Sequence, residues 1–311
     1  MTIPTAEPST NGSSHTRATP PTDPSAPRLT RFVDLLGELE ADAAAAHEAY
    51  TTGTPRGPVT GLPGLDRELG GALSAGTHVL HAGPGAGKTA LALQIAATCG
   101  SPSLFVTCEM SALELLRRHT ARVTGTFLGR LKSGELGPLE AVALARVAAE
   151  KAPQLAILDA TRAFVSADQI HELALVVRGD AGRVLVVIDS LHSWSEGMAA
   201  ATGGVDEYAR LGAALACLGT LARVLDSPVL FIAERNRAGM KPGGLSAGAG
   251  HRKIEYGCES LWELDRDEDA AGGPAGEIDV TLKIAKNRNG TPGKKVALRF
   301  HGALQRFREA D

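Results

Sequence analysis

The segment from Ala82 to Thr89 holds the residues whose types and spacing best define a chemistry. It matches the Walker A pattern, with alanine in place of the first glycine. Glycines let successive backbone N–H groups converge on phosphate oxygens, and a following helix adds the positive end of its dipole. Lys88 is expected to reach the β- and γ-phosphates, and the Thr89 hydroxyl to bind Mg²⁺. The predicted ligand is therefore ATP with Mg²⁺.

Small residues complete the predicted phosphate-binding set. The set comprises Gly83, Gly85, Ala86, Gly87, Lys88, Thr89 and Ala90. A glycine-rich turn that carries Gly-Lys-Thr by chance is the alternative. A strand pattern before the segment and a helical pattern after it favour a phosphate-binding loop, because such a loop joins a strand to a helix.

Two carboxylates follow apolar, strand-like runs. Asp189 ends the run 184–188, which gives it Walker B form and predicts a contact with Mg²⁺ through water. Glu109 lies just past the run 104–107, where a carboxylate could orient and polarise an attacking water. It could equally stabilise the N-terminus of the helix expected from Ser111. The residues alone leave both interpretations of Glu109 open.

Alternating strand and helix patterns surround these motifs. Strands are expected at 77–82, 103–107, 154–158, 184–188 and 228–233, and helices at about 87–99, 111–124, 138–151, 166–178 and 206–226. This alternation predicts an α/β fold, with a mainly parallel sheet and helices on both faces. After residue 258, short strands are expected as hairpins added to one edge, at 261–264, 278–286, 294–300 and 304–307.

The composition fits one α/β domain of about 250 residues with a tail. Of 311 residues, 43% are hydrophobic, and the net charge is −3. Such a protein does not coat nucleic acid with its whole surface, so any DNA contact must come from a local patch. The four cysteines form no CxxC pair and are interpreted as buried free thiols. No stretch suits a membrane helix or a signal peptide, so a cytoplasmic location is expected.

The N-terminal part is predicted to contain a tail, one helix and a linker. Residues 1–28 contain almost no large apolar residue and are predicted to be disordered. Residues 29–49 form an amphipathic helix, a linker runs to residue 58, and the α/β domain covers 59–311. The apolar face of the helix is formed by Phe32, Val33, Leu35, Leu36 and Leu39. This face packs either on its own domain or on a neighbouring subunit, and both possibilities stay open.

The motifs, in their order, resemble the C-terminal motor domain of the DnaB-type replicative helicases, a RecA-like P-loop ATPase. The resemblance covers nearly all of residues 59–307. Besides the Walker motifs, it rests on the segments 60–66, 105–111, 130–136 and 284–290. Segment 105–111 resembles the strand that carries the family's catalytic glutamate, which favours the catalytic role for Glu109. In a RecA-like sheet we expect this strand to neighbour the strand before the P-loop.

Further site residues are implied by the resemblance. Lys286 and Arg288 would reach the nucleotide of the next subunit, where cations stabilise the charge on the γ-phosphate oxygens. From spacing alone, they would be interpreted as basic residues that protect a strand edge. The family's γ-phosphate sensor is usually glutamine, but Glu234 occupies that position here. Its carboxylate would repel the γ-phosphate unless it pairs with Arg235 or Arg237.

Partners are also implied by the resemblance. Loops at about 191–205 and 235–253 would line the central channel of a ring, expected to be a hexamer, that encircles single-stranded DNA. The second loop carries Arg235, Arg237, Lys241, Arg252 and Lys253 and no acidic residue. It either follows a phosphate backbone or is an ordinary basic loop. The helix at 29–49 takes the place of the family's linker helix, and no primase-binding collar is expected.

Three functions are compatible with these residues. The first is an ATP-driven DNA helicase or translocase of replication. The second is a RecA-like ATPase of the RadA or KaiC type, acting in recombination or regulation without unwinding. The third is an ATP-binding module with impaired catalysis, which Glu234 suggests. The strand pattern at 296–302 and its successor favour the helicase, which is the function we predict.

Overall fold

The computed structural model of the chain describes residues 29–202, 206–234, 254–255, 257–266 and 276–310. The tail predicted at 1–28 lies outside them. The described strands form one nine-stranded sheet in the order β3-β2-β4-β5-β1-β6-β7-β8-β9. Their bounds are Gly76–Ala82 (β1), Ser103–Thr107 (β2), Leu155–Asp159 (β3), Leu185–Asp189 (β4), Pro228–Glu234 (β5), Ser260–Arg266 (β6), Glu277–Asn287 (β7), Lys295–His301 (β8) and Arg306–Glu309 (β9).

The order of the strands corrects two sequence-based expectations. Strand β2 pairs with β3 and β4, so β4 and β5 separate it from the P-loop strand β1. Strand β6 pairs parallel with β1 and continues the parallel part of the sheet, whereas β7, β8 and β9 follow as antiparallel neighbours. The crossover connections set strand order, and they leave no local pattern in the sequence.

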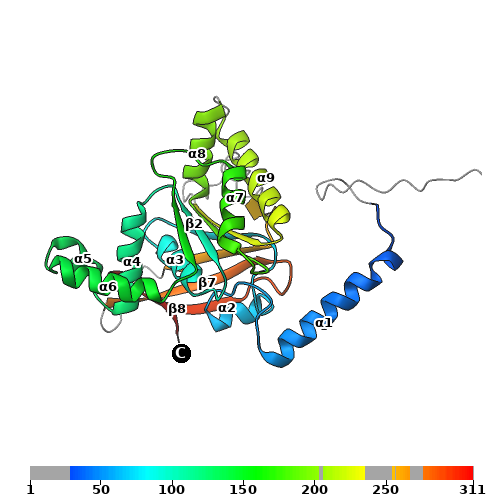
Figure 1. Cartoon of the computed structure of the whole chain (residues 1–311), viewed down its shortest axis with the longest axis horizontal. Helices are drawn as coiled ribbons and strands as arrows, with labels where there is room; N and C mark the ends of the chain where they lie inside the picture. The colour runs from blue at the N-terminus through cyan, green and yellow to red at the C-terminus, as the bar shows by residue number, and fades with distance from the viewer. Residues whose placement is uncertain (1–28, 203–205, 235–253, 256, 267–275, 311) are drawn as a thin grey trace, which may run out of the picture.

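Helices cover both faces of the sheet, as predicted (Figure 1). Their bounds are Pro63–Glu68 (α2), Lys88–Thr98 (α3), Ala112–Thr124 (α4), Leu128–Ser133 (α5), Pro138–Glu150 (α6), Ala167–Arg178 (α7), Leu191–Thr202 (α8) and Glu207–Leu225 (α9). Alternate residues of β4 show the two layers: Val187 packs in the core layer that contains α3, and Val186 in the layer that contains α7, α8 and α9. This alternation is the period of two expected of a strand buried on both faces.

Helix α8 corrects the loop expected at 191–205. Most of that segment is helical, and Val205 lies outside the described residues. Leu191 and Trp194 are almost fully buried, and Trp194 Nε1 donates to the carbonyl oxygen of Val165 at 2.9 Å. The helix is therefore held against the sheet by its first turn.

The N-terminal helix extends away from the domain (Figure 1). A 3₁₀ turn, Phe32–Leu35, leads into α1, Leu36–Thr52, which ends where Gly53 adopts a left-handed conformation with φ 68°. Neither segment contains a buried residue, and Phe32 remains 91% exposed. Packing of the apolar face on its own domain is therefore wrong for this structure.

The four cysteines are free, but only Cys99 and Cys258 are buried, while Cys108 and Cys217 are half-buried. The prediction of buried thiols thus holds for two of them. Among the described residues, no helix is long and apolar enough to cross a membrane.

Candidate functional site

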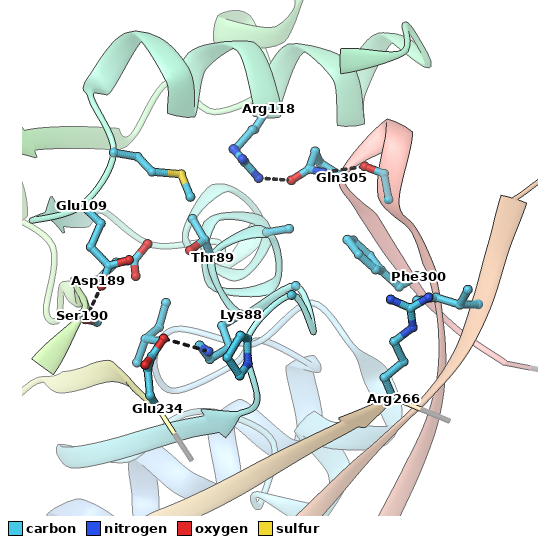
Figure 2. Close-up of a pocket in the computed structure, with 18 of the residues that line it drawn as sticks. Lys88, Thr89, Glu109, Arg118, Asp189, Ser190, Glu234, Arg266, Phe300 and Gln305 are labelled. Atoms are coloured by element: carbon cyan, nitrogen blue, oxygen red, sulfur yellow. Dashed lines mark hydrogen bonds and ion pairs between the residues drawn. The ribbon is translucent and has the colours of Figure 1, made fainter. Parts of the chain in front are cut away.

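The predicted motifs meet in one pocket at the carboxyl ends of the parallel strands, the usual ligand position in such sheets. The pocket encloses about 570 Å³. Lys88, Thr89, Glu109 and Asp189 line one side, and residues from β7, β8 and the turn before β9 line the other (Figure 2). The strands thus bring together carboxylates and a lysine that are far apart in the sequence.

The loop between β1 and α3 has the backbone that phosphate binding requires. Gly85 and Gly87 have φ values of 73° and 92°, which residues with a Cβ rarely adopt. A Cβ on Gly87 would also lie 2.8 Å from Phe307 Cζ. Ala82, in place of the first glycine, is fully buried at the end of β1, and Lys88 Nζ donates to its carbonyl oxygen at 3.1 Å. Alanine is therefore accommodated at this position.

Asp189 provides a buried carboxylate beside the loop. Its side chain is 1% exposed, and Oδ2 has no hydrogen-bond partner among the described residues. Burial is the main reason that the pKa of Asp189 is raised to about 6; the nearby charge of Glu109 acts in the same direction, whereas the Thr89 hydroxyl and Lys88 act in the opposite direction. An unpaired buried carboxylate oxygen next to a threonine hydroxyl is a donor set that fits Mg²⁺.

The Glu109 side chain lines the pocket beside the end of β4. The register of β2 and β4 places Thr107 opposite Asp189, and the Cys108 N–H donates to the Asp189 carbonyl oxygen at 2.7 Å. Glu109 Oε1 accepts hydrogen bonds from Ser190 Oγ at 2.5 Å and Ser193 Oγ at 2.9 Å. Ser111, not Glu109, caps helix α4, because its side chain accepts from the Glu114 N–H.

Glu234 lies at the end of β5 and faces the P-loop lysine. Its Oε1 is 3.8 Å from Lys88 Nζ, and its side chain is 56% exposed (Figure 2). The partners considered from the sequence, Arg235 and Arg237, lie outside the described residues. In this structure the described partner of the carboxylate is therefore the lysine that is expected to bind phosphate.

A family model described as the DnaB-like helicase C terminal domain matches residues 57–309. The chain belongs to this family. It is 29% identical to the replicative DNA helicase DnaB of Treponema pallidum over 81% of this chain and 56% of that protein. It is 24% identical to the DnaB of Haemophilus influenzae over 88% of this chain and 58% of the relative. This DnaB-like chain thus spans little more than half the length of these relatives.

Solved structures share the fold of this DnaB-like domain. A solved ATPase domain matches with a TM-score of 0.71 at 19% identity, covering 88% of this chain and 99% of that one. A DnaB-like replicative helicase matches with a TM-score of 0.70 at 19% identity, covering 90% and 72%. A KaiC-like protein from Pyrococcus horikoshii matches with a TM-score of 0.53 at 20% identity, covering 83% and 100%. The RecA-like P-loop fold is therefore confirmed.

Lys286 and Arg288 lie at the end of the DnaB-like sheet opposite its pocket. Lys286 is opposite Leu261 at the start of β6, whereas Arg266 at the end of β6 lines the pocket. At about 3.3 Å per residue, the two positions are roughly 15–20 Å apart. Lys286 Nζ donates to the Glu255 carbonyl oxygen at 2.6 Å, and Arg288 Nη1 lies 3.2 Å from Glu259 Oε1. Neither side chain joins the nucleotide pocket of its own chain.

The structure adds pocket residues that the sequence did not indicate. Arg118 on α4 donates to Gln305 Oε1 across the pocket, and its Nε lies 3.4 Å from Glu114 Oε1 (Figure 2). Arg266 lines the same pocket and points toward Phe300. Helical spacing from Leu115 and His119, which are buried, could have placed Arg118 beside the core. No local sequence pattern indicated that Gln305 would line the pocket.

The predicted DNA-binding set falls outside the residues that the structure describes. It consists of Arg235, Arg237, Lys241, Arg252 and Lys253. These cations stay a sequence-based prediction.

Proposed function

We propose that this DnaB-like domain is the motor of an ATP-dependent DNA helicase that acts as a ring on single-stranded DNA in replication. The observation that carries the proposal is the convergence of Lys88, Thr89, Glu109 and Asp189 in one pocket of a DnaB-like domain. The relatives named replicative DNA helicases support this function over a RadA-type one, because the RadA protein of Haemophilus influenzae matches only 44% of this chain.

In this proposal, each pocket residue has a separate role in ATP hydrolysis. Backbone N–H groups of the loop and Lys88 would hold the phosphates, and Thr89 and Asp189 would hold Mg²⁺. When bound, Mg²⁺ neutralises charge on the phosphate oxygens. Glu109 would orient the attacking water and accept its proton. Arg118 would add a further positive charge at the pocket wall.

Two features support assembly into a ring. Lys286 and Arg288 lie too far from their own pocket to act there, so we assign them to the nucleotide of the next subunit. The apolar residues of α1, such as Leu36 and Leu39, are 59% and 63% exposed and fit docking on a neighbouring subunit. In this proposal, residues 29–58 connect subunits and residues 59–311 form the motor.

DNA contact is assigned to the basic segment 235–253. Its cations, repeated around a ring, would concentrate positive charge in the channel even though the chain carries a net charge of −3. Binding by such a loop would be led by the phosphate backbone and tolerant of sequence.

Strand displacement from a forked DNA duplex tests the proposal. The chain is expected to displace the strand with ATP and Mg²⁺. Glu109→Gln should bind ATP but slow turnover by about 10²–10⁴-fold, the usual contribution of a general base. Lys88→Ala should lose ATP binding or turnover. Rapid ATP turnover without any strand displacement would favour the RecA-like ATPase without unwinding.

A catalytically impaired ATP-binding module is the second candidate, and the contact of Glu234 with Lys88 favours it. Binding of ATP with no turnover under any condition, including DNA, would decide for this candidate.

A further inference from the structure

Ser190, which precedes α8, and Ser193, in its first turn, hold the side chain of Glu109. Ser190 and Ser193 both donate to Oε1 of this carboxylate, at 2.5 and 2.9 Å, and neither hydroxyl engages Oε2. Ser190 directly follows the end of β4, is 2% exposed and lines the pocket. The dashed line in Figure 2 marks its hydrogen bond to Glu109. One carboxylate oxygen is thus fixed by two hydroxyls from the same short segment.

The backbone around Glu109 is already fixed without these serines. The Cys108 N–H donates to the Asp189 carbonyl oxygen at 2.7 Å. Thr107 Oγ1 donates to the Met110 carbonyl oxygen at 2.6 Å and accepts from the Met110 N–H at 3.2 Å. What remains variable is the direction of the Glu109 side chain, which has three rotatable bonds. The two hydroxyls act on that direction.

The two hydrogen bonds from Ser190 and Ser193 are not needed to compensate burial of the Glu109 charge. Glu109 is an exposed residue, so water could solvate its carboxylate without any cost of burial. Hydrogen bonds to an exposed carboxylate restrict where it points. Their consequence is therefore orientation.

The segment that carries the serines is rigidly supported. Trp194 is 1% exposed, and its Nε1 donates a hydrogen bond to the Val165 carbonyl oxygen. A Cβ added at Gly197 would lie 3.0 Å from Phe164 Cδ2, so α8 also packs closely on the segment after β3. A group held by such a supported element keeps a defined geometry.

We propose that Ser190 and Ser193 are positioning residues that direct the Glu109 carboxylate at the attacking water, so that α8 sets the geometry of hydrolysis. The inference rests on the proposed ATPase function and on the role given to Glu109. Because both hydroxyls act on Glu109 and not on the phosphate-binding loop, their loss lowers kcat and leaves KM for ATP nearly unchanged.

Steady-state ATP hydrolysis by serine variants of the full chain tests this role. Ser190→Ala is expected to lower kcat on the order of tenfold with KM within about twofold of the parent, because misorientation alone is costly. Ser193→Ala should have a smaller effect, and Ser193→Thr, which keeps the hydroxyl, should retain activity. Ser195→Ala is the matched control, because the Ser195 hydroxyl is on the same helix and donates to the His192 carbonyl oxygen at 2.8 Å. Thermal unfolding verifies that each variant is folded.

A double-mutant cycle with Glu109→Gln separates positioning from a general structural effect. If the serines act through Glu109, Ser190→Ala has no further effect on kcat in the Glu109→Gln background. An equal loss in both backgrounds, or a kcat that rises on removing the hydroxyls, overturns the inference. A parent chain without ATP turnover, or normal turnover by Glu109→Gln, would overturn the proposed function itself. These two outcomes therefore differ from a failure of the positioning role alone.

Discussion

The carboxylate of Glu234 carries a charge that would oppose the proposed binding of ATP. Its carboxylate lies 3.8 Å from Lys88 Nζ, so the γ-phosphate and the carboxylate would compete for one cation. ADP lacks the γ-phosphate and should compete less. We expect Glu234→Gln to tighten ATP binding by roughly tenfold, the effect of one nearby charge in a partly exposed site, and ADP binding much less.

Isothermal titration calorimetry with both nucleotides measures this difference. Glu263→Gln is the control, because Glu263 also pairs with a lysine, Lys283, at 3.1 Å but outside the pocket. Equal changes in ATP and ADP affinity for Glu234→Gln would contradict the competition.

If Asp189 binds Mg²⁺ as proposed, the binding of Mg²⁺ with ATP should depend on pH. Burial raises its pKa from an ordinary value of 3.8 to about 6, so the carboxylate that would bind Mg²⁺ forms only as the pH rises through about 6. Affinity for Mg²⁺ with ATP should therefore increase up to about pH 7 and then level off. Fluorescence titration with a labelled ATP analogue measures it, and Asp189→Asn should bind weakly without this pH dependence.

The same shift has the opposite sign for folding. Because the folded-state pKa of Asp189 is raised, its contribution to stability is fully present below pH 3.8 and is lost as the pH rises through about 6.

An affinity for Mg²⁺ with ATP that does not change between about pH 5 and pH 8 would contradict the assignment of Asp189.

At the scale of elements, the β8–β9 hairpin supports the P-loop helix α3. The Gln94 side chain, 8% exposed, donates to the Phe307 carbonyl oxygen at 3.0 Å and accepts from its N–H at 2.9 Å. Phe307 stacks on Phe300 with ring centroids 4.3 Å apart, and both rings lie against Gly87. A strand at the sheet edge therefore contacts the predicted phosphate-binding loop.

Removing this connection should destabilise the domain. Gln94→Ala leaves two buried backbone groups of Phe307 unpaired, so we expect the free energy of unfolding to fall by about 2–3 kcal/mol. Urea denaturation measures the change. Gln169→Ala is the control, because Gln169 is in an exposed capping box of α7 and should cost about 1 kcal/mol or less. Equal losses of unfolding free energy for the two variants would contradict a specific stabilising role of the hairpin.

Elements with a continuous local pattern could be predicted from the sequence. The apolar run ending at Asp189 predicted β4 within a residue, because a strand buried on both faces is apolar throughout. The family resemblance implied a loop where helix α8 lies, and Gly197 and several serines weaken the helical pattern that could have indicated the helix. Its burial depends on Trp194 packing against a distant segment, which the sequence does not display.

The site was predictable where motifs are local and not where contacts are long-range. The P-loop and the two carboxylates were found by type and spacing, and the structure brings them together. The expected pairing of β2 with β1 was wrong, because strand order depends on the crossovers. The contact of Arg118 with Gln305 joins α4 to the turn before β9, and neither neighbourhood indicates the other.

At the scale of the whole molecule, the proposed action of Arg288 on a neighbouring subunit would make turnover depend on assembly. It lies beside Glu259 at the sheet end opposite the pocket. If it acts on a neighbouring subunit, Arg288→Ala should reduce ATP turnover by about 10³-fold, as for other arginine fingers supplied in trans.

Mixed assemblies test action in trans. Arg288→Ala subunits keep an intact pocket, and Lys88→Ala subunits keep an intact Arg288, so mixing two inactive variants should restore turnover at some interfaces. Activity at no mixing ratio above the sum of the separate variants would contradict action on the neighbour.

The central claim is that this DnaB-like domain couples ATP hydrolysis to single-stranded DNA. Steady-state ATP turnover of the purified chain, with and without single-stranded DNA at low and moderate salt, tests it most directly. The account predicts strong stimulation by DNA that weakens as salt rises, because binding to the phosphate backbone releases counterions. ATP turnover that is indifferent to DNA at both salt concentrations would contradict the helicase function.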